Sequence, residues 1–302
     1  MEAIKVILNP VAGRGYGAKA EPQLREWLKA EGVEFDLVRT AAPGHAVELA
    51  EQAARDGFAT IVAAGGDGTS NEVLNGLMAA AQDGAGAVMG FLPVGSGCDL
   101  ANTMGVSGDL RTACRKLANG RIRTVDVGRV TIPGRFSRYF GNFVGIGFDA
   151  VVTRETAKVK RLRGLALYLP VVLKTVFLYY RAPQVKVECD GQEWSLPALM
   201  VCVTNGPREG GGFFVAPEAR PDDGLFDLCI AREVSQLEIL RMIPRFMKGA
   251  HVGHRAITMA RGQRVTISSP DGLVAHMDGE LICEDAQRIE CEILPGRLQV
   301  WG

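Results

Sequence analysis

Three glycines surround one carboxylate in the stretch GGDGTSNE, where Gly65, Gly66 and Gly68 flank Asp67. The stretch follows an apolar run and precedes a segment with helical spacing. Glycines at such a junction let backbone amides approach a ligand, and the first amides of the helix favour a phosphate. A carboxylate among those amides is explained if it meets the phosphates through a divalent cation. The stretch therefore predicts a magnesium nucleotide site, with a tight βα turn as the structural alternative.

Two better-known phosphate motifs are excluded by spacing. Neither GGDGTSNE nor GRGYG at 13–17 has the G-x-G-x-x-G spacing of a dinucleotide site. Neither has the G-x-x-x-x-G-K-[ST] spacing of a Walker loop. An oxidoreductase with a bound dinucleotide is therefore not indicated.

The elements that would position this turn alternate along the first 120 residues. Apolar runs at 3–8, 35–39, 60–64 and 87–92 predict strands, and the segments between them predict helices. Because the apolar runs are nearly continuous, we expect a parallel sheet covered by helices on both faces. Such sheets bind ligands at the carboxyl ends of their strands, where the glycine turn lies.

From about Arg121 the pattern changes to short strands separated by D-G and P-G turns, which indicates a mostly antiparallel second domain. Two helices are expected within it. One covers 154–180 with a bend at Pro170, and the other starts at a Ser235 capping box and ends near Lys248.

The predicted fold class is therefore α/β plus β. A three-layer α/β domain with a parallel sheet would cover 1–124, with 293–302 as a candidate addition. A mostly antiparallel β-sandwich with inserted helices would cover 125–292.

Composition limits the partners. Lys and Arg together equal Asp and Glu at 34 each, so no global charge attracts nucleic acid, and none is expected as a partner. Seven scattered cysteines without a CxxC pair predict neither a disulfide framework nor a zinc site, and favour the cytoplasm. The N-terminus lacks the pattern of a signal peptide.

One segment is a candidate membrane contact. Residues 164–180 are apolar but contain Pro170 and Lys174, which favours a buried or surface-lying helix over a spanning one. The preceding basic cluster consists of Lys158, Lys160, Arg161 and Arg163. It could rest on anionic lipid, and the alternative is a solvated helix face.

The stretch GGDGTSNEVLNGL resembles the signature of the diacylglycerol kinase catalytic domain. This lipid kinase family also includes sphingosine and ceramide kinases and, more distantly, NAD kinases and phosphofructokinases. Further stretches are similar to family motifs in family order: NPVAGRG (9–15), LPVGSGCDLANTMG (92–105), VDVGRV (125–130), GIGFDA (145–150), PEARPDDGLFDL (217–228) and HMDGE (276–280). Because they span nearly the whole chain, the resemblance implies a stand-alone bacterial lipid kinase that uses ATP and Mg²⁺.

The resemblance implies roles for individual residues. Strand ends around the nucleotide would carry Asn9, Gly13, Thr40 and Arg14, the last where relatives often have Lys. The phosphates would be surrounded by Gly65, Gly66, Asp67, Gly68, Thr69, Glu72 and Ser96, the last at the family's Thr position. Asp67, Asp99 and Asp126 would form a carboxylate cluster for magnesium and water, unless Asp99 caps a helix and Asp126 belongs to a turn.

Glu280 is the expected general base, because a lipid hydroxyl must lose its proton as it attacks phosphorus. The residues MDGE also predict a type I′ hairpin turn with Glu280 at its exit. By resemblance, a structural magnesium would be held by the carbonyls of Arg220 and Leu225 and the side chain of Asp223. The alternative there is a plain D-D-G turn.

One residue departs from the family pattern. Relatives usually have Asn after the residue equivalent to Gly97, whereas this chain has Cys98. We expect weaker nucleotide binding or an altered base preference, with the loop geometry kept.

The leading hypothesis is an ATP-dependent lipid kinase acting on a lipid alcohol such as diacylglycerol, with peripheral contact to a membrane. The alternatives are an NAD kinase-like enzyme and a non-catalytic lipid- or nucleotide-binding protein on the same fold. Monoacylglycerol, a sphingoid base and a polyprenol remain candidate acceptors, and the oligomeric state is open, a homodimer included.

Overall fold

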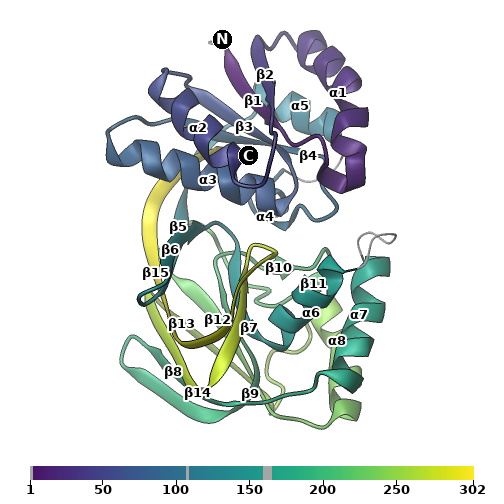
Figure 1. Ribbon diagram of the computed structural model, residues 1–302, viewed down its shortest axis with the longest axis vertical. Helices are drawn as coiled ribbons and strands as arrows, with labels where there is room; N and C mark the ends of the chain where they lie inside the picture. Colours follow the sequence, from purple (N-terminus) through teal and green to yellow (C-terminus); the bar gives the residue numbers. More distant parts are fainter. Residues whose placement is uncertain (1–2, 107–108, 159–164) are drawn as a thin grey trace. The chain divides into compact units, whose positions relative to one another are not determined.

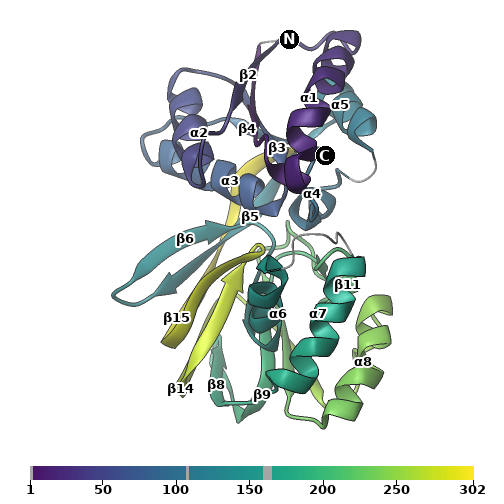
Figure 2. The same ribbon diagram turned by 45° about the vertical axis from the view of Figure 1, so that its right-hand side comes forward.

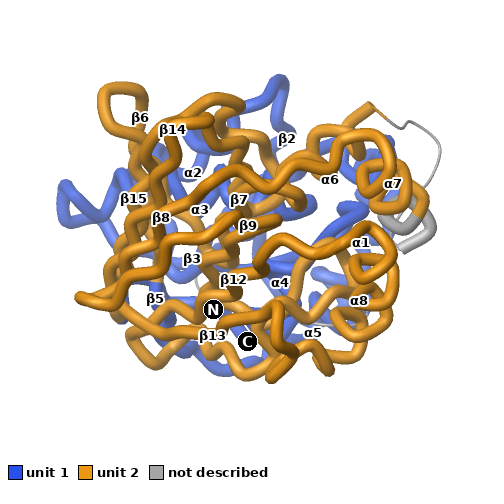
Figure 3. Tube along the Cα trace, turned by 90° about the horizontal axis from the view of Figure 1, so that it is seen from below, with its two compact units in different colours: residues 1–126, 296–302 blue, residues 127–295 orange. Residues whose placement is uncertain are grey.

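The structure is a computed structural model that describes residues 3–106, 109–158 and 165–302, and it forms two compact units (Figure 3). Unit 1 comprises Met1–Asp126 and Gly296–Gly302, and unit 2 comprises Val127–Pro295. The domain boundaries predicted from the sequence lie after residue 124 and after residue 292. The chain therefore passes between the units twice, and each unit is described by itself below.

Unit 1 has a parallel sheet between two layers of helices (Figure 1). The sheet order is β2-β1-β3-β4, with β1 (Ile4–Leu8), β2 (Phe35–Arg39), β3 (Thr60–Gly65) and β4 (Val88–Pro93). The helices are α1 (Ala12–Ala30), α2 (His45–Arg55), α3 (Asp67–Gln82), α4 (Asp99–Thr103) and α5 (Leu110–Asn119). Helices α2 and α3 pack together on one side of the sheet, and α1 and α5 on the other.

The sequence explains the layers of unit 1. Every residue of β3 is buried, as a strand between two helical layers requires. Helix α2 turns a stripe of alanines inward, and Gly76 of α3 lies so close to it that a Cβ there would meet the carbonyl of Val47 and the side chain of Ala50. Small residues thus set the short distance between these helices.

Unit 2 is mostly antiparallel, with one side covered by helices (Figure 2). Its main strand order is β13-β12-β9-β7-β14-β15, while β5 pairs with β15 and β6, and β8 pairs with β14 and β9. Two of its strands begin or end in unit 1: β5 (Ile122–Ile132) and β15 (Glu280–Trp301). The others are β6 (Phe136–Phe140), β7 (Phe143–Gly147), β8 (Gln184–Cys189), β9 (Gln192–Thr204), β10 (Arg208–Glu209), β11 (Phe213–Phe214), β12 (Phe226–Arg232), β13 (Ile257–Gly262) and β14 (Arg264–Met277). The helices are α6 (Phe148–Ala157), α7 (Leu165–Leu178) and α8 (Gln236–Lys248).

The predicted fold class is confirmed, and one helix prediction needs correction. The expected single helix over 154–180 corresponds to α6, which begins already at Phe148, and to α7. Gly147, with a φ of 95°, ends β7 and turns the chain directly into α6, a change that apolar periodicity does not reveal. Lys160, Arg161 and Arg163 of the predicted basic cluster lie outside the described residues.

Helix α8 begins as its capping box predicts, because the Oγ of Ser235 accepts the backbone N–H of Glu238 at 3.3 Å. Among the helices of the described ranges, none is long and apolar enough to cross a membrane.

Candidate active site

The glycine turn of unit 1 lies against a second loop, residues 94–98. The backbone N–H groups of Val94 and Gly95 both donate to the carbonyl of Gly65, at 3.1 and 3.0 Å. A Cβ on Gly95 would overlap the backbone of Gly66, and a Cβ on Gly97 would lie 2.7 Å from Oδ2 of Asp67. Two backbones can approach this closely only because these positions have no side chain.

Asp67 is held at the junction of the two loops. It is the first residue of α3, and its N–H donates to the carbonyl of Gly97 at 3.2 Å. Its Oδ1 accepts the N–H of Leu100 at 2.9 Å, so the carboxylate reaches the start of α4, directly beside Asp99. The structure therefore brings Asp67 and Asp99 together from residues that are 32 positions apart.

Asp126, the third expected carboxylate, is also buried, with an exposed fraction of 3%. Its Oδ1 accepts the N–H of Gly296 at 2.8 Å. These two residues lie where the chain leaves unit 1 and where it returns. This hydrogen bond links the position where the chain leaves unit 1 to the position where it returns.

Strand ends position the other expected nucleotide residues. Asn9 follows β1, and its Nδ2 donates to Oγ1 of Thr69 at 2.9 Å, which links the first strand to the glycine turn. Thr40 follows β2 and donates its N–H to the carbonyl of Leu8. Gly68 lies in the first turn of α3, and Ser96 is exposed on the neighbouring loop. Brought to one edge of the sheet, these groups fit a ligand at the strand ends.

Glu72 has a clear structural task. Its two carboxylate oxygens accept the N–H groups of Gly44 and Ala46, at 2.8 and 3.1 Å. These donors lie at the N-terminus of α2, where backbone N–H groups lack partners within the helix. Glu72 thus caps α2 from α3, and its expected place near the phosphates stays a prediction.

The first turn of α1 contains an unusual, non-helical backbone conformation. Gly13, Arg14 and Gly15 have φ values of 56°, 58° and 84°, in succession. A left-handed conformation is costly for a residue with a side chain, so Arg14 is a locally strained position. Such strain is often found at ligand sites. Arg14 is exposed, so its guanidinium group lies on the surface near the N-terminus of α1.

Cys98 lies in the loop at 94–98, against the glycine turn. Its Sγ lies 3.8 Å from the carbonyl of Gly65. Burial, with the charge of Asp67 adding to it, raises the pKa of this thiol to about 12. The side chain is therefore a neutral thiol at physiological pH.

In unit 2, Glu280 lies at the exit of the β14–β15 hairpin. The turn residues Asp278 and Gly279 have φ values of 44° and 86°, as a type I′ turn requires, so the predicted hairpin is confirmed. The Glu280 side chain is 39% exposed, and its Oε2 lies 3.4 Å from Nη1 of Arg138. The carboxylate is therefore accessible, which a general base must be.

Asp278 is a residue whose importance the sequence prediction missed. Its Oδ1 accepts the N–H groups of Asn142 and Phe143 at 3.1 and 2.9 Å, and its Oδ2 accepts that of Gly141 at 2.9 Å. This buried carboxylate holds the β6–β7 loop against the hairpin that carries Glu280. The only sequence signal was the D-G pair, which any type I′ turn explains.

The expected metal loop forms a polar hollow in unit 2. Its lining includes Arg220, Asp223, Asp227 and Arg261. The Oδ1 of Asp223 accepts the N–H of Leu225 at 3.2 Å, and its Oδ2 pairs with Arg261. Asp227 was not predicted; its Oδ2 is buried without a partner among the described residues, and burial raises the pKa of this carboxyl group. An incompletely satisfied carboxylate beside Asp223 is compatible with a hard cation.

A second buried group of polar side chains escaped the sequence analysis. Nε2 of His276 lies 3.3 Å from Oδ2 of Asp149 and 3.3 Å from Oε1 of Glu209. Burial disfavours the charged imidazole, but the bonds to the two carboxylates outweigh it and raise the pKa of His276 to about 10. The donor atoms lie within 4.8 Å of one another, close enough for one metal ion, yet the imidazolium already supplies the positive charge.

Two family models cover the chain. The diacylglycerol kinase catalytic domain matches residues 3–130, and the YegS C-terminal NAD kinase beta sandwich-like domain matches residues 142–302. A diacylglycerol kinase of Bacillus subtilis (strain 168) is 31% identical over 283 residues, which are 93% of this chain and 90% of the relative. The chain belongs to the diacylglycerol kinase family.

Other family members agree in length. A YegS-like lipid kinase of Chromohalobacter salexigens is 32% identical over 92% of this chain and 88% of its own. A diacylglycerol kinase crystal structure from Bacillus anthracis str. Sterne aligns with a TM-score of 0.73 at 21% identity, covering 99% of this chain and 96% of that one. A second structure from that organism aligns with a TM-score of 0.79 at 24% identity, covering 99% and 96%. The likeness to these two structures, which covers 99% of this chain, shows a shared fold.

Proposed function

We propose that this lipid kinase transfers the γ-phosphoryl group of ATP to the hydroxyl of a lipid alcohol, with diacylglycerol as the first candidate and phosphatidic acid as its product. The observation that carries the proposal is the position of Asp67. It stands among glycine backbones at a helix N-terminus, in the unit that matches the diacylglycerol kinase catalytic domain. A carboxylate at an anion-binding helix start fits a ligand that brings its own cation.

The chain's residues would divide the work as follows. Amides of the glycine turn and the loop at 94–98 would bind the phosphates, with Arg14 adding positive charge. Asp67 and Asp99, together with Asp126, would hold the Mg²⁺ that accompanies ATP, whose charge neutralises the phosphate oxygens. Glu280 would accept the proton of the attacking hydroxyl. Positioning of this kind is the main contribution of a protein to phosphoryl transfer.

Transfer of labelled γ-phosphate from ATP to lipid alcohols in mixed micelles tests the proposal directly. We expect labelled diacylglycerol with the natural chain, and a loss of about 10³-fold or more with Asp67→Ala and with Glu280→Gln. Matched controls are Asp83→Ala, an exposed carboxylate of unit 1, and Glu284→Gln, an exposed carboxylate of β15. Unchanged transfer with Asp67→Ala would contradict the proposed site.

The same assay separates the alternatives. NAD is included as an acceptor, and labelled NADP instead of labelled lipid would indicate an NAD kinase. ATP binding without any labelled product would indicate a non-catalytic binding protein. The acceptors tested are diacylglycerol, monoacylglycerol, a sphingoid base and a polyprenol. The acceptor that becomes labelled identifies the lipid substrate.

A lipid acceptor also requires contact with a membrane, and we place this contact at the end of α7. Phe177 and Leu178 are 59% and 65% exposed. Lys174, on the same helix and 48% exposed, pairs with Glu155 at 2.9 Å. Exposed apolar side chains at the end of a helix suit insertion into the surface of a bilayer.

All seven cysteines are free, which fits a protein working in the reducing cytoplasm.

Co-sedimentation with phosphatidylglycerol vesicles tests this contact. Phe177→Glu combined with Leu178→Glu should reduce the bound fraction several-fold, because two charges would enter the interface. Ile122→Glu, at a position 48% exposed in unit 1, is the matched control. Equal sedimentation of both variants would rule out α7 as the contact.

A further inference from the structure

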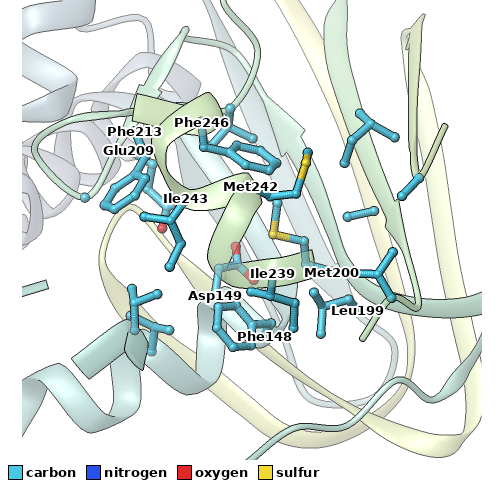
Figure 4. Close-up of a pocket in the computed structure, with 18 of the residues that line it drawn as sticks. Phe148, Asp149, Leu199, Met200, Glu209, Phe213, Ile239, Met242, Ile243 and Phe246 are labelled. Carbon is cyan, nitrogen blue, oxygen red and sulfur yellow. The ribbon is translucent and has the colours of Figure 1, made fainter. Parts of the chain in front are cut away.

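A buried group of three side chains in unit 2 has no role in the proposed transfer reaction. It consists of Asp149 at the start of α6, Glu209 in β10 and His276 in β14. The side chains of His276, Asp149 and Glu209 are 1%, 11% and 17% exposed. Asp149 and Glu209 both line one pocket of this unit (Figure 4). The group therefore brings one imidazole and two carboxylates together in a nearly dry place.

The spacing of the donor atoms suits ligands around a single ion. Nε2 of His276 lies 3.3 Å from Oδ2 of Asp149 and 3.3 Å from Oε1 of Glu209. Hydrogen bonds from a charged N–H to a carboxylate are shorter, at about 2.7–2.9 Å. Two ligands bound at about 2.0–2.2 Å to one tetrahedral zinc ion lie about 3.3–3.6 Å apart. The three donor atoms all lie within 4.8 Å of one another, so one ion can reach each of them.

The charges of the group also favour a cation. Nε2 of His276 carries at most one proton, and a single N–H cannot point well at two carboxylates at once. One imidazolium also leaves one of the two negative charges unmatched. A divalent cation bound to a neutral imidazole balances both carboxylates. Because the group is buried, an unmatched charge there is costly, and a matched set of charges is favoured.

The fold holds the three donors in place. His276 pairs with Gly145 of β7, where a Cβ would meet both Oδ2 of Asp149 and Nε2 of His276. The imidazole ring packs at a steep angle against Phe143, with ring centroids 4.7 Å apart. Oδ1 of Asp149 accepts the N–H of Ala150 at 2.9 Å, while Oδ2 faces the imidazole. The donors are thus positioned by backbone and packing contacts.

We propose that Asp149, Glu209 and His276 form a zinc site, with water as the fourth ligand. Zinc accepts nitrogen and oxygen ligands together, whereas Mg²⁺ and Ca²⁺ favour oxygen ligands. The ion reaches the site past Glu209, whose side chain is the most exposed of the three. It cross-links α6 and β14 to the β10–β11 hairpin, which forms a separate two-stranded sheet. The inference does not depend on the proposed function, because that reaction assigns no step to these residues.

Calorimetric titration of the full chain with Zn²⁺ tests the site. Excess Mg²⁺ is present throughout, to fill sites made of oxygen ligands such as the expected loop at Asp223. The natural chain should bind one zinc ion, and His276→Gln and Glu209→Gln should bind it at least about 100-fold more weakly. This estimate follows because the loss of an outer partner alone costs about 10- to 100-fold in metal affinity. Equal zinc affinity of the natural chain and Glu209→Gln, or no zinc binding at all, would overturn the proposal.

His254 provides the matched control. Its Nε2 also faces a carboxylate, at 3.6 Å from Oε1 of Glu238, but that carboxylate is already paired with the exposed Arg255. His254→Gln should therefore bind zinc as the natural chain does. Glu209 is partly exposed in a strand of two residues, so its variant keeps the test available if His276→Gln fails to fold. Loss of zinc binding in His254→Gln with full binding in Glu209→Gln would move the site elsewhere and overturn the assignment.

Cobalt reports the geometry of the bound ion. Co²⁺ held by four ligands in a tetrahedron absorbs visible light far more strongly than six-coordinate Co²⁺. The natural chain with Co²⁺ and excess Mg²⁺ should show the strong tetrahedral bands, and Asp149→Asn should lose them. A weak six-coordinate spectrum of the natural chain would overturn the proposal. Neither titration contains ATP or lipid, so a failure of the zinc site and a failure of phosphoryl transfer are distinguishable.

Amide hydrogen exchange tests the cross-link to the β10–β11 hairpin. Zinc should slow the exchange of the N–H groups at 208–214 about tenfold in the natural chain, because opening of the hairpin would then require release of the ion. In Glu209→Gln the exchange should be the same with and without zinc. Exchange in the natural chain that zinc leaves unchanged would overturn the cross-link.

Discussion

Two carboxylates, two positions apart in the β14–β15 hairpin, have opposite surroundings. Asp278 is 3% exposed and accepts three backbone N–H groups, whereas the Glu280 side chain is 39% exposed. The first is suited to fixing the loop between β6 and β7, and the second to meeting a substrate. Asp278 is therefore a positioning residue for Glu280.

Replacing Asp278 tests this division. In Asp278→Asn the charge that accepts three N–H groups is lost, so the free energy of unfolding should fall by about 3 kcal/mol. Catalysis should fall as well, through a lower kcat with KM little changed. Asp285→Asn is the control, because Asp285 is 74% exposed in a surface ion pair with Arg135 and should cost less than 1 kcal/mol. Denaturant titration and kinetics give both values, and an unaltered kcat would contradict the positioning role.

His276 makes a prediction about pH. Its folded pKa is raised from 6.5 to about 10 by the carboxylates of Asp149 and Glu209, against the effect of burial. Below about pH 6.5 the imidazole is protonated in both states and its stabilisation is fully present. As the pH rises towards 10, the unfolded chain gives up its proton first, and this stabilisation is lost.

The measurement compares the natural chain with His276→Gln in urea at pH 6, 8 and 10. The difference in unfolding free energy should shrink as the pH rises. Cys202, which also contacts Asp149, does not interfere, because burial raises the pKa of its thiol well above 9.0. A difference that stays constant from pH 6 to pH 10 would show that His276 is not protonated in the folded chain.

Only part of this residue-level picture could be predicted from the sequence. Asp67 and Glu280 lie in short motifs, and the neighbouring glycine and aspartate residues are enough to predict the turn in each. Asp149, Glu209 and His276 are separated by 60 and 67 positions, and only the pairing of β14 with β7 brings two of them together. No local pattern carries that information.

At the scale of elements, the two loops of unit 1 depend on the absence of side chains. Gly95→Ala should push the loop at 94–98 away from Gly66, since the added Cβ would overlap its backbone. We expect a loss of stability of about 2 kcal/mol and at least tenfold weaker ATP binding.

Gly86→Ala is the matched control for this change. A Cβ at Gly86 meets nothing within 4 Å and its φ is not in the left-handed region, so the variant should be neutral or slightly stabilising. Calorimetric ATP titration and thermal unfolding check both variants. Equal ATP affinity of Gly95→Ala and Gly86→Ala would show that contact between the loops does not form the nucleotide site.

Element prediction succeeded where periodicity is uniform and failed where one residue redirects the chain. The strands of unit 1 were predicted to within a residue or two, because each is a continuous apolar run between helices. The start of α6 was wrong by six residues, because Gly147 converts the apolar stretch after β7 into a helix. A glycine with positive φ leaves no trace in hydrophobic spacing.

At the scale of the molecule, unit 1 depends on residues 296–302, which follow unit 2 in the sequence. Val300 pairs with Met89 of β4, and Nε1 of Trp301 donates to Oγ1 of Thr60 at 3.3 Å. Leu298 and Val300 are 4% and 0% exposed, so this segment contributes to the core of unit 1. The alternation of buried and exposed residues along it is that of a strand with one covered face.

A pair of double variants tests that dependence. Leu298→Ala with Val300→Ala should lower the free energy of unfolding by about 4 kcal/mol, from lost burial and the cavities left behind. Arg297→Ala with Gln299→Ala changes the exposed positions of the same strand and should cost less than 1 kcal/mol. Limited proteolysis should cleave unit 1 faster in the first pair only. Equal stability of the two pairs would mean that unit 1 holds together without this strand.

The chain passes through unit 1, then unit 2, and then returns to unit 1. This path determines the order in which the parts of each unit are synthesised. A ribosome makes a protein from its N-terminus, so residues 1–126 emerge early but wait for residues 296–302, which are made more than 160 residues later. Unit 2, which is continuous from Val127 to Pro295, needs no residue after Pro295 to complete its own sheet. Unit 1, although most of it is encoded first, is thus the last of the two units to have all of its residues.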